Sequence, residues 1–133
     1  MEQWKEIMTS ANRAYEGGQE VEAEELYKAA CQRATFLLTQ CEDREAAVAM
    51  LSVSNQNLAD LYFRQGRCDE ALTAYGKLLR HLEQLSQEEG VHSQFAAPAL
   101  HKVGTELSQE VRARKLVVPK DHPDLEPVRD LIT

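Results

Sequence analysis

Cysteine and long apolar runs are scarce in this chain, and each scarcity excludes a class of protein. The three cysteines, Cys31, Cys41 and Cys68, are an odd number with no Cys-x-x-Cys pair, so we expect free thiols, not disulfides or zinc ligands. No apolar run approaches the roughly 18 residues that span a bilayer, and no signal peptide opens the sequence. We therefore expect a cytoplasmic protein without membrane contacts.

Catalytic and ligand-binding motifs are also missing. The sequence has neither a nucleophile elbow nor a phosphate-binding glycine loop. Its four histidines form neither an HExxH motif nor a paired cluster. The net charge of −7 repels the phosphates of DNA and RNA. We expect no enzyme activity, no metal, no cofactor and no nucleic-acid partner.

What the chain does contain is helix-forming sequence. Its 133 residues fit one domain, and 43% of them are apolar although only 6% are aromatic. Apolar residues spaced i, i+3, i+4, i+7 predict helices near residues 2–16, 19–40, 43–65 and 68–88. Asp43 is the expected N-cap of the third helix. The second helix is expected to bury Val21, Ala23, Leu26, Tyr27, Ala30, Ala34, Leu37 and Leu38.

The last third of the chain is less regular. Gly90 is expected to separate the fourth helix from a fifth one that Ser93 caps and that continues to about Lys115. Pro98 is compatible with that helix only in its first turn. In the tail, His122-Pro123 resembles a helix start, but Pro127 conflicts with it, so we expect a short or late-starting last helix.

A repeat with an offset of 48 residues organises the chain. It relates Ala11 to Ala59, Gly18 to Gly66, Ala23 to Ala71 and Tyr27 to Tyr75. Small residues are expected where paired helices approach closely, the glycines at tight turns, and the tyrosines between neighbouring hairpins. A repeat of this kind predicts an all-α stack of antiparallel helix hairpins.

These residues resemble the tetratricopeptide repeat (TPR) family. The matching stretches run from Ser10 to Ala30 and from Asn57 to Leu79, and the resemblance covers roughly Met1 to Val111. The usual repeat has about 34 residues, so the longer period here is closer to the extended repeats of the kinesin light chain class. The chain departs from the pattern at Ile7, Ser10 and Leu78, and it lacks the proline that usually ends the second helix.

The resemblance implies a single domain with two complete units. The expected divisions are a first repeat at about 2–41, a second at about 43–89, a degenerate capping helix at about 93–115 and a tail at 116–133.

The resemblance also implies a binding groove that is lined by the first helix of each hairpin. By position, the residues of this peptide groove are Lys5, Thr9, Asn12, Asn57, Asp60, Arg64 and Lys102. Asparagine has a donor and an acceptor, so Asn12 and Asn57 are suited to holding a peptide backbone. A clamp for a terminal carboxylate is not expected, because only Lys102 matches its cations.

Two functions follow from this interpretation. The leading one is a non-catalytic adaptor or chaperone-like module that binds a peptide or helix of another protein in the groove. The alternative is a structural homo-oligomerisation module whose groove is filled by its own tail or by a second copy. A short stack has exposed ends, and this favours a homodimer.

Overall fold

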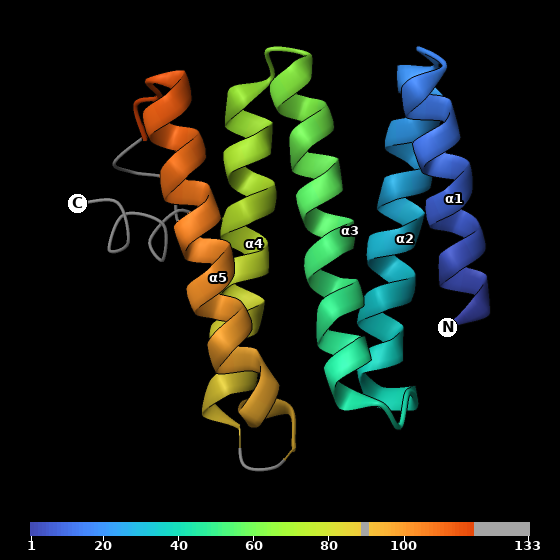
Figure 1. The fold of residues 1–133 in the computed structure, drawn as a ribbon, viewed down its shortest axis with the longest axis vertical. Helices are drawn as coiled ribbons and strands as arrows, with labels where there is room; N and C mark the ends of the chain where they lie inside the picture. The colour runs from blue at the N-terminus through green and yellow to red at the C-terminus, as the bar shows by residue number, and fades with distance from the viewer. Residues whose placement is uncertain (89–90, 119–133) are drawn as a thin grey trace.

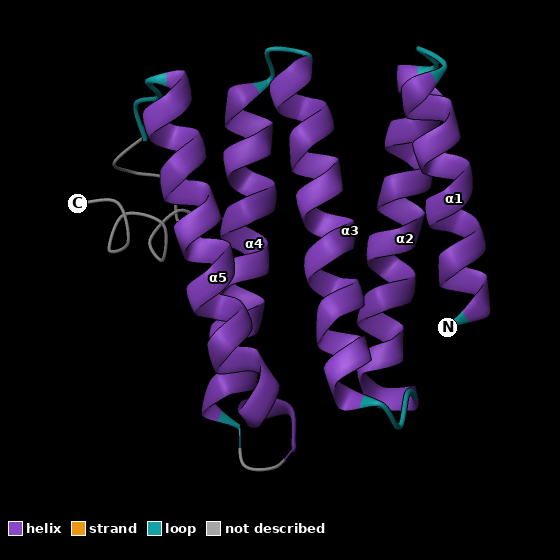
Figure 2. Cartoon of the chain, viewed as in Figure 1, coloured by secondary structure: helices purple, strands orange, loops and turns teal. Residues whose placement is uncertain are grey.

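The fold is entirely helical in the part of the chain that the computed structural model describes, which is residues 1–88 and 91–118. Its helices are α1 (Glu2–Glu16), α2 (Glu20–Gln40), α3 (Arg44–Arg64), α4 (Cys68–Gln87) and α5 (Val91–Arg114). Figure 2 shows that short loops join α1 to α2, α2 to α3 and α3 to α4. The all-α prediction is confirmed. The predicted break at Gly90 and the short helix in the tail lie outside the described residues.

Consecutive helices run antiparallel, so α1, α3 and α5 point in one direction and α2 and α4 in the other (Figure 1). Side chains join the first helices of successive hairpins. Between α1 and α3, the Trp4 indole Nε1 donates a hydrogen bond of 2.7 Å to Ser54 Oγ. Between α3 and α5, Gln56 donates a hydrogen bond to Glu106. The predicted stack of helix hairpins is therefore confirmed.

The same turn closes the first helix of each hairpin. Gly18 and Gly66 have φ angles of 76° and 75°, in the left-handed region that glycine adopts without steric cost. The residue after each glycine donates its backbone N–H over 2.8 Å to the carbonyl five residues earlier. This bond is the signature of the Schellman motif. The offset of 48 residues thus appears in the backbone as well as in the sequence.

A third copy of this turn ends α5. Lys115 has a φ of 54°, and Leu116 donates its backbone N–H to the carbonyl of Val111 over 3.0 Å. A lysine here carries the strain that glycine avoids in the other two turns. In its direction and in its ending, α5 is therefore equivalent to α1 and α3.

Two expectations about α5 are wrong. The helix begins at Val91 instead of at a Ser93 cap, and Pro98 lies inside it instead of in its first turn. Proline removes one helical hydrogen bond. The helix nevertheless continues, because Ala96, Val103 and Leu107, which are at most 2% exposed, hold both of its halves in the core.

The buried stripe of α2 is also corrected at one position. Val21 was expected in the core but is 82% exposed. Residues advance by about 100° along a helix, so Val21 lies about 200° away from the buried Ala23. At α3, in contrast, the predicted cap is confirmed, because the Asp43 carboxylate accepts a hydrogen bond of 3.0 Å from the backbone N–H of Ala46.

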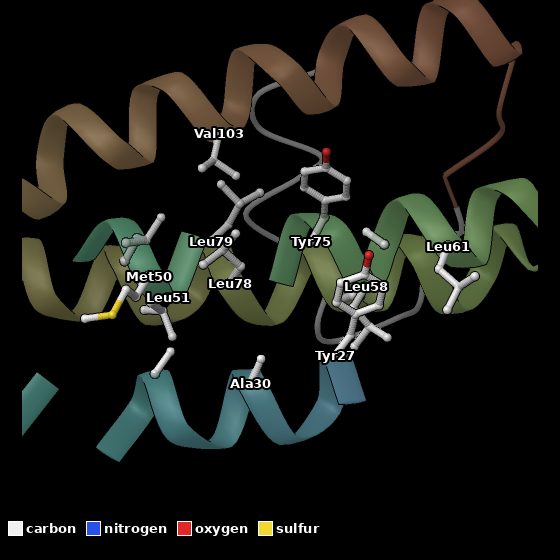
Figure 3. Close-up of a cluster of buried hydrophobic side chains, with 14 of the residues drawn as sticks. Tyr27, Ala30, Met50, Leu51, Leu58, Leu61, Tyr75, Leu78, Leu79 and Val103 are labelled. Carbon is white, nitrogen blue, oxygen red and sulfur yellow. The ribbon is translucent and has the colours of Figure 1, made fainter. Parts of the chain in front are cut away.

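The core is continuous and contains side chains from α2, α3, α4 and α5 (Figure 3). The four repeated alanines, Ala11, Ala23, Ala59 and Ala71, are 0% exposed. Their small size allows the paired helices to approach closely, as expected. Tyr27 and Tyr75 are both 3% exposed and supply the large side chains. Within the described residues, no helix has an apolar stretch long enough to cross a lipid bilayer.

Candidate functional site

A groove runs along the line of contact between α3 and α5. Its first part has a volume of about 330 Å³ and is mostly apolar. The apolar lining consists of Val48, Ala49, Val53, Phe95, Pro98, Ala99 and Val103. We call this part the apolar groove. Glu45 and Lys102 also line it and carry opposite charges, so this part has little net charge.

A second hollow, which is acidic, lies beside the first between α3 and α5. Its lining includes Asn57, Asp60, Glu106 and Glu110, together with the phenol of Tyr75. We call this part the acidic end. Gln56 lines both parts, so the two are adjacent. On α3, Val53 and Asp60 are seven residues apart, and this spacing places them on the same face of the helix.

The carboxylates of the acidic end differ in their partners. Glu106 accepts a hydrogen bond from Gln56, and Glu110 forms an ion pair of 2.7 Å with Arg114 Nε. Asp60 has neither a hydrogen bond nor an ion pair with any residue that the structure describes. Burial raises the pKa of the Asp60 carboxyl to about 6, and the negative charges of Glu110 and Glu106 add to this shift, whereas Arg114 opposes it.

The repeat explains why Asp60 is unusual. Its equivalent in the first hairpin is Asn12, whose Oδ1 accepts a hydrogen bond of 2.6 Å from the hydroxyl of Tyr27. In the second hairpin, Asp60 stands in place of this asparagine, beside the equivalent Tyr75. Burial raises the pKa of Tyr75 to about 12, and the charge of Asp60 contributes to the shift. An ionised carboxylate therefore occupies a position where the other hairpin has a neutral amide.

Replacing Asp60 with asparagine is expected to stabilise the protein at neutral pH. The folded-state pKa lies above the unfolded value of about 3.9, so ionisation of Asp60 costs folding free energy fully above about pH 6. The side chain of Asp60 is exposed, so solvent screens its interactions, and we expect a gain of about 1 kcal/mol, well below the full value of the shift. Urea unfolding, followed by circular dichroism, measures this gain.

The pH dependence separates this explanation from a simple packing effect. The advantage of Asp60→Asn is expected to shrink as the pH falls through about 6 and to vanish near about pH 4, where both states of the wild type are protonated. An equal advantage at neutral and acidic pH would contradict the electrostatic explanation.

The structure brings three of the seven predicted groove residues to this site. Asn57 and Asp60 line the acidic end, and Lys102 lines the apolar groove. Two of the others lie on α1, where Lys5 forms an exposed ion pair with Glu2 and Thr9 donates to the carbonyl of Lys5 over 2.8 Å.

The other two predicted residues, Asn12 and Arg64, take part in contacts within the fold. The carbonyl oxygen of Asn12 is used by Tyr27. The Arg64 guanidinium lies 4.8 Å from the ring centroid of Tyr15, in a cation–π contact between α3 and α1. These residues were expected to extend the groove along α1. The structure instead uses them in contacts within the fold, apart from the groove along α5.

Sequence reasoning missed Val53, Phe95, Glu106 and Glu110. A signal for the two glutamates was present, because Lys102, Glu106 and Glu110 follow one another at i, i+4 spacing and so share one face of α5. The exposure of Val53, 41%, could not be read from its apolar character.

Other candidate chemistry is limited. The described residues contain no group of three or more histidine, cysteine, aspartate and glutamate side chains arranged to hold a metal ion. Burial raises the pKa of the Cys31 thiol to about 12, so this cysteine is a thiol and not a reactive thiolate at neutral pH.

Comparison with known proteins gives one result. Neither the curated proteins nor the solved structures include a match to this chain. The profile of one family, described as protein of unknown function (DUF2753), matches residues 2–113. The match extends from the first residue of α1 to the last turn of α5, and the chain therefore belongs to this family.

Proposed function

We propose that this protein is a non-catalytic, TPR-like interaction module that acts in the cytoplasm as an adaptor or chaperone-like protein. It binds a peptide segment or helix of a partner protein in the groove between α3 and α5. The apolar groove is the observation that carries the proposal. Its position agrees with the TPR resemblance, which implies binding along the first helices.

The size and chemistry of the apolar groove suit a partner side chain. A volume of about 330 Å³ lies within the roughly 300–1,000 Å³ typical of ligand pockets. Val53 is 41% exposed and Phe95 is only partly buried, so apolar surface is available there. Covering such surface with an apolar side chain of a partner is favourable by about 25 cal/mol per Å².

A single substitution tests the proposal. Val53→Arg places a long charged side chain in the apolar groove and is expected to abolish capture of specific partners in a pull-down quantified by mass spectrometry. Val21→Arg is the matched control, because Val21 is also exposed on a helix but lies on α2, away from the groove. Partners that bind the wild type and both variants equally would contradict the groove as the binding site.

Sedimentation of the same variants tests the alternative function. If the wild type is a dimer and Val53→Arg is a monomer, a second copy fills the groove, and the protein is a homo-oligomerisation module. If the wild type is already a monomer at tens of micromolar, that alternative is excluded.

A further inference from the structure

We infer that the partner segment carries an apolar side chain and, about 10 Å further along, a lysine or arginine that binds at Asp60. This inference rests on the proposed function and adds the chemistry of the partner to it. The spacing follows from α3, because Val53 and Asp60 lie seven residues apart at about 1.5 Å per residue.

The charges around the groove favour a cation at one end only. At the acidic end, Arg114 largely neutralises Glu110, which leaves Asp60 and Glu106 to face a ligand. Glu106 already accepts one hydrogen bond from Gln56, whereas Asp60 has neither a hydrogen bond nor an ion pair with a described residue, and only the charge of Arg114 acts favourably on it. The apolar groove, in contrast, has one acid and one base, Glu45 and Lys102, in its lining.

A cationic side chain would relieve the repulsion that the fold leaves at this position. Burial disfavours the ionised form of Asp60, and the negative charges of the two neighbouring glutamates add to this effect. An ammonium or guanidinium group placed between these carboxylates replaces repulsion with charge-assisted hydrogen bonds. Among the nearby cations of the protein, Arg64 stacks on Tyr15, and Arg114 pairs with Glu110 while its charge offsets only part of the repulsion at Asp60. The acidic end is therefore complementary to a basic segment.

Synthetic peptides of defined charge test this inference. The probes are two peptides that each present one leucine and one lysine. The two residues are about seven positions apart in the first peptide, which favours a helix, and about three apart in the second, which favours an extended backbone. A second pair carries glutamate in place of the lysine. Titration into labelled protein, followed by NMR, detects weak binding and locates it on α3 and α5.

The lysine peptides are expected to bind and the glutamate peptides to bind at least about tenfold more weakly. Asp60→Asn, a nearly isosteric change, is expected to weaken the lysine peptides about tenfold. Asp60→Lys is expected to reverse the preference in favour of glutamate. Val21→Arg, remote from the groove, is the control and is expected to bind like the wild type.

Two results would overturn the inference. One is equal binding of lysine and glutamate peptides to the wild type, and the other is no binding of either lysine peptide. Both leave the proposed function to be decided separately by the Val53→Arg pull-down. A glutamate peptide that binds in a Val53-dependent manner would support the groove and reject the basic partner.

Discussion

Replacing Leu79 with alanine is expected to lower the free energy of unfolding by about 3 to 4 kcal/mol. Leu79 lies on α4 and is 0% exposed. Figure 3 shows its side chain next to that of Val103 of α5, in the core that also contains Leu78. Removing the isobutyl group leaves a cavity between two helices that are held apart by other buried side chains, so the structure can close the cavity only in part.

Such a loss is a large fraction of the roughly 5 to 15 kcal/mol that stabilises a typical domain. Equilibrium unfolding in urea measures it, with Leu26→Ala as the matched control. Leu26 lies on α2 and is only partly buried, so its replacement is expected to cost about 1 kcal/mol. An equal loss of stability in both variants would contradict the full burial of Leu79 as the source of the larger effect.

Replacing Trp4 with alanine is expected to cost about 2 to 3 kcal/mol, less than a fully buried tryptophan would. The Trp4 side chain is partly buried, and its indole N–H donates to Ser54 Oγ, on a serine that is 0% exposed. The substitution therefore removes apolar packing and leaves the buried hydroxyl without its donor. Urea unfolding measures the total cost.

The effect of Trp4→Ala is expected to be local. In a stack, each helix pair is stabilised mainly by its neighbours, and α1 lies at one end of this one (Figure 1). Hydrogen exchange should therefore show lost protection in α1 with little change in α4 and α5. Ser54→Ala, which keeps the indole, should cost only about 1 kcal/mol. A uniform loss of protection along the chain would contradict a separable α1.

The fold could be predicted from this sequence because its signals are local and repeated. The glycines at 18 and 66 and the alanines at helix contacts each fix a turn or a close approach, and the capping carboxylate of Asp43 lies within one turn of its donor. Pro98 misled the prediction for the opposite reason. Tertiary packing keeps α5 helical around Pro98, and the helix propensity of the local sequence does not report such packing.

The candidate site was harder to predict because it depends on which helices meet. The TPR resemblance pointed to Asn57, Asp60 and Lys102, but the register of α5 against α3 decides which side chains of α5 join them. That register places Glu106 beside Gln56 and makes the site acidic. The spacing of apolar residues within one helix cannot predict the register between two helices.

The three equivalent turns at Gly18, Gly66 and Lys115 make the stack modular in a practical sense. An engineered duplication of the segment from Arg67 to Lys115 would begin and end at the same left-handed turn, so it would enter the array without a new type of joint. Each added copy would add one more line of contact between first helices, where the proposed binding groove lies, and a longer scaffold with a chosen number of repeats could be assembled in this way.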